Sequence, residues 1–421
     1  MLQYRSSHSL ENIREKMSHL SLGAVVFAVV QLVRCCEGYN SDEFRPTPDL
    51  IRSHNYSVES YKVITADNYI LAMHRISGSP KAGKCERKPV VFLQHGMLGS
   101  SADWVILGPE KSLGYLLADQ CYDVWLGNSR GNRYSRKHRT LSTEDFNFWD
   151  FSWHEMGLYD LPAEIDYILK KTHKKQLFYV GHSMGTTMFY VLMSRRPEYN
   201  NKVVHMTSLA PVAYMEHVRS PLIRLASKLP GPNTILEVLR YFGTGEYQPN
   251  ADLYRVMTDT GCPARVFKQP KLSRNSAFLL TGYDPSELEK DELSLVLGHF
   301  PSGTSTKTVL HYAQEIYSPD GGFREWDTRI QIFRPFYVMH DGAPPSYELN
   351  KISVPVTLFY SDNDIFVGVE DVQRLNRTLG HSVGEHHIPV PTFSHMDFIL
   401  GRDVRTLVND VVIAIIGSFA F

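Results

Sequence analysis

The residues best suited to chemistry are 181–185, whose sequence Gly-His-Ser-Met-Gly fits the pattern Gly-x-Ser-x-Gly. An apolar, aromatic and β-branched run, Leu177–Val180, precedes the pattern, and a helical pattern follows from Thr186. A sharp turn from a strand into a helix would expose the serine hydroxyl, and glycines would avoid collisions with the neighbouring strand and helix. This context predicts that Ser183 is a nucleophile, provided that a histidine accepts its proton.

The partners of such a serine should follow in the order Ser, Asp, His. A buried-strand pattern at Val354–Tyr360 ends close to Asp362 and Asp364, and His395 later lies in a loop before a helical pattern. We predict that His395 is the general base and then the general acid, and that Asp364 orients its ring. Asp362 is the competing acid, because either carboxylate could lie at the strand end while the other caps the following segment.

Acyl transfer also needs hydrogen-bond donors for the oxyanion that forms on the substrate. The strand-like run Pro89–Leu93 leads into His95-Gly96, which suits an oxyanion loop although it is equally compatible with an ordinary turn. We predict the backbone N–H groups of Met97 and of Met184, the residue after the nucleophile, as the donors. Backbone donors do not depend on side-chain identity, so methionine is acceptable at both positions.

At this point the chain resembles the acid lipase family, which includes gastric lipases and lysosomal acid lipase. The likeness extends from about Asp49 to Asp410, and its most family-specific part is Asn-Ser-Arg-Gly-Asn at 128–132. The other segments that carry it are 123–127, 135–138, 148–152, 159–163, 209–213 and 394–398. The resemblance implies an α/β-hydrolase fold, the same triad of Ser183, Asp364 and His395, and the same oxyanion donors.

The implied activity is hydrolysis of long-chain fatty acid esters, triacylglycerols or sterol esters, through an acyl-enzyme at a lipid–water interface. Two other classes of function stay open. One is a catalytically silent lipid-binding or storage protein, which would require a broken triad. The other is a non-lipase serine hydrolase, such as an esterase, thioesterase or peptidase.

The chain departs from the family pattern in several places. Met184 stands where the family more often has glutamine, and the loop at 362–367 lacks the usual Gly-Gly-x-Asp form. Thr281 stands where a disulfide partner for Cys262 would be expected in the cap. The difference at Thr281 argues against the cap disulfide of the family and leaves the chemistry unaffected.

Strand-like runs alternate with helical patterns, which predicts a mostly parallel sheet covered by helices on both faces. The predicted strands are Tyr61–Thr65, Tyr69–Arg75, Pro89–Leu93, Tyr122–Leu126, Leu177–Val180, Val203–Leu209, Val356–Tyr360 and His386–Val390. The first two should form a hairpin about Asp67-Asn68. Representative helical patterns are Asp160–Lys171 and Thr186–Arg196.

One connection is too long for a single crossover. This connection runs from Leu209 to Val356, and its length is several times the about 30 residues that a strand–helix–strand unit needs. We therefore predict a hydrolase core at 39–213 and 348–421, with a cap inserted at 214–347 above the serine. The cap is rich in apolar residues, and we expect a mobile cap that exposes an apolar site at a lipid surface.

The N-terminus predicts a removed signal peptide at 1–38, because the apolar run Leu20–Val33 is too short to span a bilayer. A secretory route implies an extracellular or lysosomal protein and makes Asn55 and Asn376 candidates for glycosylation. Cleavage would leave Cys85, Cys121 and Cys262, which allow one disulfide at most. We expect Cys121 to be a buried thiol beside its strand, not bridged to Cys262.

The composition is that of an ordinary globular enzyme, with 43% hydrophobic and 21% charged residues. The formal net charge of −1 gives no reason to expect nucleic acid or an anionic membrane surface as a partner. No pattern of metal ligands appears, so we expect no metal, no cofactor, no membrane span and a monomer. The apolar C-terminal run should belong to a final helix, Asp403–Ala414, that packs on the sheet rather than to a lipid-anchor signal.

Overall fold

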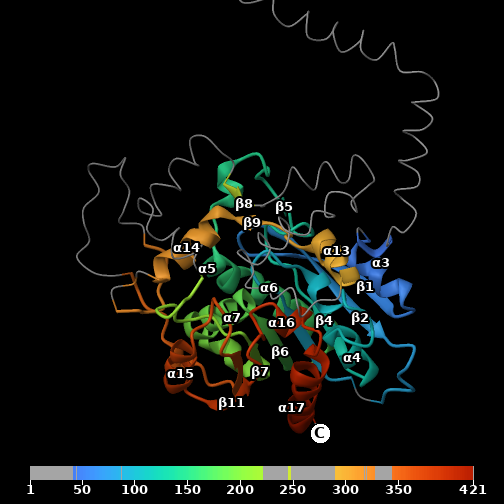
Figure 1. The fold of residues 1–421 in the computed structure, drawn as a ribbon. Helices are drawn as coiled ribbons and strands as arrows, with labels where there is room; N and C mark the ends of the chain where they lie inside the picture. Colours follow the sequence, from blue (N-terminus) through green and yellow to red (C-terminus); the bar gives the residue numbers. More distant parts are fainter. Residues whose placement is uncertain are drawn as a thin grey trace, which may run out of the picture. The chain divides into compact units, whose positions relative to one another are not determined.

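The structure is a computed structural model of the chain (Figure 1). It describes residues 41–43, 45–86, 88–220, 245–247, 290–316, 318, 320–327 and 344–420. All of these except Ser41 belong to one compact unit, formed by 42–249 and 274–421. The predicted signal peptide, Cys262 and much of the predicted cap lie outside the described residues.

A mixed, mostly parallel sheet of nine strands dominates this part of the chain, in the order β1-β2-β4-β3-β6-β7-β10-β11, with β5 paired to β2. Its strands are β1 (Ser57–Ile64), β2 (Tyr69–Gly78), β3 (Val90–Gln94), β4 (Asp123–Leu126), β5 (Lys137–His138), β6 (Leu177–His182), β7 (Val203–Leu209), β10 (Val356–Ser361) and β11 (Ser382–Ile388). The hairpin β1–β2 and the pair β2–β4 are antiparallel. The neighbouring strands β4, β3, β6, β7, β10 and β11 run parallel to one another. The eight predicted strands and the predicted hairpin are thus confirmed, with ends shifted by a few residues.

The burial of the strands explains why they were visible in the sequence. Every residue of β3, β4, β6 and β10 is buried, as expected for parallel strands covered on both faces. The edge strand β1 is mostly exposed or half-buried instead. The turn between β1 and β2 is closed at Asn68, whose φ of 74° lies in the left-handed region that asparagine tolerates better than most residues.

Two groups of helices pack on the sheet. The helical segments of the core are α3 (Thr47–Ser53), η2 (Ser101–Trp104), α4 (Leu113–Asp119), η3 (Phe146–Trp149), α5 (Trp153–Glu155), η4 (Met156–Asp160), α6 (Leu161–Thr172), α7 (Met184–Arg195), η5 (Pro197–Lys202), η6 (Leu349–Lys351), α15 (Val369–Thr378), α16 (Asp397–Leu400), η7 (Arg405–Asn409) and α17 (Asp410–Ala420). In one group, α5, α6 and α7 pack together, with α6 against β1 and α7 against β6. In the other, α4 and α17 both contact η7, and they reach β2, β4 and β7.

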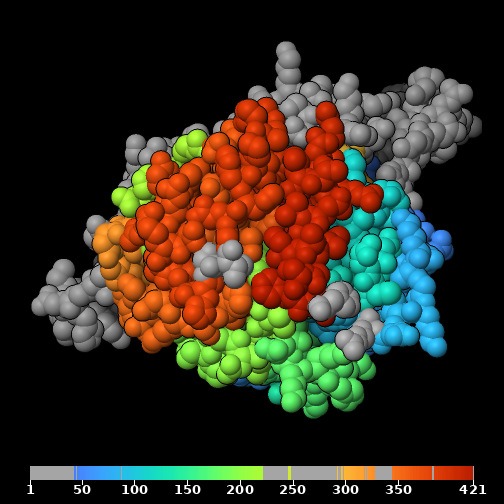
Figure 2. Space-filling model, turned by 90° about the horizontal axis from the view of Figure 1, so that it is seen from below, coloured from blue at the N-terminus to red at the C-terminus, as the bar shows by residue number. Residues whose placement is uncertain are grey.

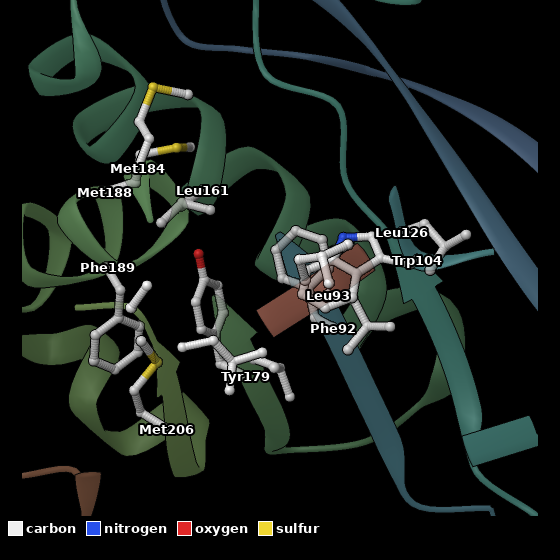
Figure 3. Packing of buried hydrophobic residues seen from close by; sticks show 14 of the residues in the cluster. Phe92, Leu93, Trp104, Leu126, Leu161, Tyr179, Met184, Met188, Phe189 and Met206 are labelled. Atoms are coloured by element: carbon white, nitrogen blue, oxygen red, sulfur yellow. The ribbon is translucent and has the colours of Figure 1, made fainter. Parts of the chain in front are cut away.

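The core lies between the sheet and these helices, and Figure 3 shows part of it. Phe92 of β3 and Tyr179 of β6 meet edge to face, with ring centroids 5.6 Å apart, and Phe189 of α7 packs 4.9 Å from Tyr179. The Tyr179 hydroxyl donates to the Gly185 carbonyl at 2.8 Å. This bond joins the strand before the Gly-x-Ser-x-Gly turn to the helix after it.

The described part of the connection between β7 and β10 holds α13 (Lys290–His299), α14 (Thr306–Ile316) and a short ribbon of β8 (Glu246–Tyr247) and β9 (Thr304–Ser305). These elements lie in the upper part of the coloured ribbon in Figure 1, above β6 and β7. His311 of α14 stacks on Trp153 of α5 at 3.7 Å, and Phe323 lies 5.4 Å from the same tryptophan. α14 is therefore held against the core by aromatic contacts, while the boundaries 214 and 347 of the cap remain a prediction.

The C-terminus differs from the sequence prediction in its bounds. The predicted helix Asp403–Ala414 is a π-turn, η7, continued by α17 to Ala420. Figure 2 shows these dark red C-terminal residues on the surface seen from below. α17 buries Val412 and Ile416 against the core. Among the described residues, no helix is long and apolar enough to cross a membrane.

The expectation that Cys121 is a buried thiol is wrong. Cys121 forms a disulfide with Cys85, across a sequence separation of 36. The reason is local: Cys121 lies in the tight turn from α4 into β4 with a φ of 65°, and it is only partly buried. The sulfur therefore meets the loop between β2 and β3 instead of entering the core.

Candidate active site

The carboxyl ends of the parallel strands meet at one edge of the sheet. The register pairs Gln94 at the end of β3 with Gly181 of β6, and Gly181 with Ser208 of β7. The loops that follow β3, β6 and β10 therefore start side by side. They carry Met97, Ser183 and Asp364, while Met184 begins α7 and His395 follows the neighbouring edge strand β11.

The turn at Ser183 has the strained geometry of a nucleophile elbow. Ser183 has a φ of 51° and a ψ of −116°, and its N–H donates to the Leu209 carbonyl at 3.0 Å. A Cβ on Gly181 would lie 2.8 Å from the carbonyl carbon of Gly185, and a Cβ on Gly185 would lie 2.4 Å from the oxygen of Gln94. The predicted reason for both glycines is confirmed, because a side chain at 181 would collide with the backbone of α7 and one at 185 with the end of β3.

The structure brings Ser183, His395 and Asp364 together. The Ser183 hydroxyl and His395 Nε2 are 2.7 Å apart, and His395 Nδ1 lies 2.8 Å from Asp364 Oδ2. With Asp364 ionised, Nδ1 carries the proton that it donates to the carboxylate, so Nε2 is free to accept the serine proton. The three residues are almost enclosed, with exposed fractions of 9%, 5% and 1%.

The two candidate acids have different environments. Asp364 Oδ1 accepts the backbone N–H groups of Phe366 and Val367 at 2.8 and 3.1 Å, which leaves Oδ2 directed at His395. The Asp362 side chain is 65% exposed and pairs with His387 of β11 at 3.0 Å. The geometry therefore favours Asp364 as the partner of His395.

A buried network holds the predicted oxyanion loop. The Ser129 N–H donates to His95 Nε2 at 3.0 Å, so Nε2 is an acceptor and His95 Nδ1 donates to the Gly96 carbonyl at 2.7 Å. The Asn132 amide also reaches His95 Nε2, at 3.2 Å. Burial lowers the pKa of His95 to about 4, which keeps this ring neutral. The segment 128–132 thus supports the loop without meeting the reacting atoms.

The loop approaches the nucleophile closely at Gly96. A Cβ on this glycine would lie 3.1 Å from the Cβ of Ser183 and 2.9 Å from Nδ1 of His182. Met97, the next residue, lines the same pocket as Ser183. Met97 therefore lies in the loop beside the nucleophile and Met184 begins the helix that follows it, and the role of their N–H groups as donors remains a prediction.

His182, which precedes the nucleophile, connects the loops. Its Nε2 donates to the backbone carbonyl of His395 at 3.0 Å. Burial, with a smaller contribution from His395, lowers the pKa of His182 to about 3, so the ring stays neutral. Sequence reasoning missed this role, because a histidine inside Gly-x-Ser-x-Gly carries no signal of its contacts.

A pocket opens beside Ser183 and is mostly apolar. The described residues that line it are Gly96, Met97, Leu98, Asp103, His182, Ser183, Val212, Met215, Phe300, Tyr312, Phe366, His395 and Met396. Tyr312 comes from α14, and its hydroxyl lies 3.0 Å from that of Thr187 on α7. The predicted cap segment therefore contributes to this pocket. Sequence analysis did not single out Asp103 or any apolar lining residue except the oxyanion-loop Met97.

A second missed residue is Arg219, which lies where the chain enters the predicted cap. Its guanidinium donates to the backbone carbonyls of Asp362 and of Asp364, the latter at 2.9 Å. Its own backbone N–H donates to the Ile365 carbonyl at 2.9 Å. Arg219 therefore clamps the loop that carries the acid.

In the described part of the chain, no cluster of side chains is suited to hold a metal ion.

The two glycosylation candidates differ in accessibility. Asn55 is exposed in the turn after α3, with a φ of 63°. Asn376 lies within α15, is half-buried, and its amide donates to Glu385. The turn presents the Asn55 amide to solvent, whereas the helix keeps that of Asn376 occupied.

Comparisons with known proteins agree with this architecture. A family model described as the partial alpha/beta-hydrolase lipase region matches residues 47–108, and one described as the alpha/beta hydrolase fold matches residues 89–231. The chain is 42% identical over 379 residues to Lipase 3 of Drosophila melanogaster, which covers 89% of this chain and 94% of that protein. It is 36% identical over 365 residues to gastric triacylglycerol lipase of Bos taurus, covering 86% of this chain and 89% of the relative.

Solved structures support the fold. A protein of Sulfolobus solfataricus superposes with a TM-score of 0.56 at 15% identity, over 86% of this chain and 94% of that one. These matches confirm the predicted α/β-hydrolase fold and the resemblance on which it was based.

Proposed function

Because the chain belongs to the acid lipase family of the α/β-hydrolase superfamily, we propose that it hydrolyses carboxylic esters of long-chain fatty acids with a Ser183–His395–Asp364 triad. The observation that carries the proposal is the pair of short contacts from Ser183 to His395 and from His395 to Asp364, at 2.7 and 2.8 Å. The role in the organism would be lipid catabolism.

The proposed mechanism proceeds through an acyl-enzyme. Ser183 Oγ attacks the ester carbonyl carbon while His395 Nε2 takes the hydroxyl proton, and Asp364 stabilises the imidazolium. The Met97 and Met184 N–H groups receive the negative charge on the carbonyl oxygen. His395 then gives its proton to the leaving alcohol, and a water molecule repeats the sequence to release the fatty acid and free Ser183.

The proposed substrate class is triacylglycerols, sterol esters or both, met at a lipid–water interface. The family membership and the apolar lining by residues such as Met215, Phe300 and Phe366 support a long acyl chain in the pocket. The name of the gastric triacylglycerol lipase relative favours triacylglycerol. A panel of triolein, cholesteryl oleate and short-chain esters, measured at several pH values, tests this choice.

The triad is tested with Ser183→Ala and His395→Ala. Each variant should lose several orders of magnitude in kcat, because Ser183→Ala lacks the proposed nucleophile and His395→Ala the proposed base. Ser183→Ala should also fail to react with a fluorophosphonate probe while its unfolding transition stays unchanged. Retention of full esterase activity by a folded variant contradicts the assignment.

The same experiment separates the remaining alternatives. A lipid-binding protein without catalysis would leave the wild-type chain unlabelled by the probe and inactive on every ester. A thioesterase or peptidase would be labelled, but it would prefer thioesters or amides to long-chain oxygen esters. The short contacts of Ser183 favour an active hydrolase over a silent one.

We propose a secretory route that ends outside the cell or in a lysosome. The Cys85–Cys121 disulfide supports it, because such bonds persist in oxidising compartments. On this route Asn55 should carry a glycan and Asn376 should not. Mobility shifts of Asn55→Gln and Asn376→Gln after glycosidase treatment, with N-terminal sequencing of the mature chain, test the proposal.

A further inference from the structure

We propose that Asp103 faces the substrate in the ester pocket, and that the pocket works only while this carboxyl group carries its proton. The inference rests on the proposed ester hydrolysis and concerns the regulation of that same site. Of the described residues that line the pocket beside Ser183, Asp103 alone has a carboxyl group.

The position of the carboxyl group follows from its two oxygens. Asp103 Oδ1 accepts the Ser100 N–H at 3.2 Å, which closes a capping box at the start of η2. Oδ2 lies against the oxyanion loop, because a Cβ on Gly99 would be only 2.1 Å from it. The Gly99 N–H in turn donates to the Gly96 carbonyl at 3.1 Å. Asp103 therefore borders both the pocket and the turn that carries the predicted donor Met97.

An ionised carboxyl group at this place opposes the reaction in two ways. The tetrahedral intermediate places a negative charge on the oxygen bound by the oxyanion loop, and a like charge beside that loop raises its energy in a site of low dielectric. An acyl chain that fills the pocket also removes water from the carboxylate, which is costly for an ionised group. The protonated acid has neither penalty, and its O–H can donate to an ester oxygen.

The surroundings of Asp103 keep it protonated to an unusually high pH. Burial raises the pKa of Asp103 to about 7, and the Ser100 N–H and Arg133 oppose this rise only in part. The other titratable groups among the described lining residues are His182, His395 and Tyr312. Burial keeps His182 and Tyr312 uncharged by lowering the pKa of the first and raising that of the second. Among the described lining residues other than the proposed base His395, Asp103 is therefore the group whose charge changes near neutral pH.

The expected consequence is a rate that falls as pH rises. His395 must be neutral to accept the serine proton, and ionisation of Asp103 adds a second requirement at higher pH. Ionisation of Asp103 should give an alkaline limb, with kcat/KM falling up to roughly tenfold per pH unit above about 7. Asp103→Asn keeps the side-chain oxygen that accepts the Ser100 N–H but cannot ionise, so it should lose this limb.

The experiment measures kcat/KM between pH 5 and 9 with a soluble butyrate ester, with the released butyrate quantified by chromatography. Ser183→Ala supplies the background of spontaneous hydrolysis at each pH. The matched control is Glu144→Gln, which removes one negative charge from an exposed residue that does not line the pocket. This variant should keep the alkaline limb. The pH dependence of fluorophosphonate labelling gives a second readout of Ser183 without any lipid interface.

An alkaline limb in the wild type that is absent or displaced by at least one pH unit in Asp103→Asn, but present in Glu144→Gln, supports the inference. A wild type without a limb between pH 6 and 8, or an unchanged limb in Asp103→Asn, overturns it. If Asp103→Asn does not fold, Asp103→Glu replaces it, and an unchanged midpoint then counts against the inference. Failure of the proposed function is distinct, because the wild type would then hydrolyse no ester at any pH.

Discussion

Replacing Arg130 by methionine should destabilise the fold far more than the loss of a surface ion pair. The guanidinium of Arg130 donates to Asp160 at 2.8 Å and to Asp67 at 2.9 Å, and its carbon lies 3.9 Å from the Tyr69 ring centroid. The side chains of Arg130 and Asp160 are 1% and 0% exposed. Removing one partner of a buried pair leaves the other without compensation, which costs about 3–5 kcal/mol.

The effect on the melting temperature follows from the size of the chain. With about 2.1 cal/mol/K of unfolding entropy per residue, the 421 residues give roughly 0.9 kcal/mol/K, so the expected fall in Tm is about 3–6 °C. Urea unfolding monitored by tryptophan fluorescence gives the free energy directly. Arg52→Met is the matched control, because Arg52 pairs with Asp49 at the surface with 57% and 50% exposure, where a pair contributes roughly 0–1 kcal/mol.

The same variant should show a pH dependence of known sign. Burial raises the pKa of Asp160 to about 6 against the opposing attraction of Arg130, and without Arg130 this pKa should rise further. A carboxyl whose pKa is raised by folding favours the folded state below its unfolded pKa, and this contribution is lost as pH rises through the folded pKa. The destabilisation by Arg130→Met should therefore be small at pH 4.5 and large at pH 8. An equal loss at both pH values, or one no larger than that of Arg52→Met, refutes the reasoning.

Asp364→Asn should lower kcat on a soluble ester by several orders of magnitude, and Asp362→Asn should lower it far less. Of these two acids, only Asp364 contacts His395. The reverse order of the two effects would assign the role to Asp362. Arg219→Ala should lower kcat several-fold at unchanged KM, because Arg219 holds the loop that carries Asp364 and does not contact substrate. Arg219→Lys should restore part of the rate. A change in KM alone would argue against this role of Arg219. Loss of the Cys85–Cys121 bridge in a double alanine variant should lower the free energy of unfolding by about 4 kcal/mol, measured in urea. An unchanged unfolding midpoint would contradict a stabilising role for this bond.

The sheet could be predicted because its central strands are buried on both faces. Such strands read as short apolar runs, and β3, β6 and β10 each end in a polar residue, Gln94, His182 and Ser361. Ser183, Asp364 and His395 each follow a predicted strand. Because parallel strands end at the same edge of the sheet, the sequence predicted that the three residues lie near one edge. The bounds of α17 were missed because its apolar residues continue past Ala414 without a stop signal.

What could not be predicted depends on contacts between loops. The pairing of Cys85 with Cys121 requires two turns, after β2 and after α4, to meet, and no spacing of cysteines reveals that. The choice between Asp362 and Asp364 also needed the loop, because both lie within three residues of the same strand end. Asp103 forms a capping box at the start of η2, as many helix-start residues do; only the fold shows that it also lines the pocket and borders the oxyanion loop.

These observations separate the residues that identify the chemistry from those that identify the family. Gly-x-Ser-x-Gly arises wherever a strand must turn into a helix and present a nucleophile, so many unrelated substrates share it. The segment 128–132 has no reacting atom, yet its Ser129 and Asn132 hold His95 and its Arg130 neutralises Asp160 in the interior. A buried polar network of this kind tolerates little change, because each lost partner leaves a charge or donor unsatisfied. The family-specific sequence therefore lies in the support of the oxyanion loop, one layer behind Ser183, and substitutions there should alter stability and loop geometry before they alter the chemistry of the triad.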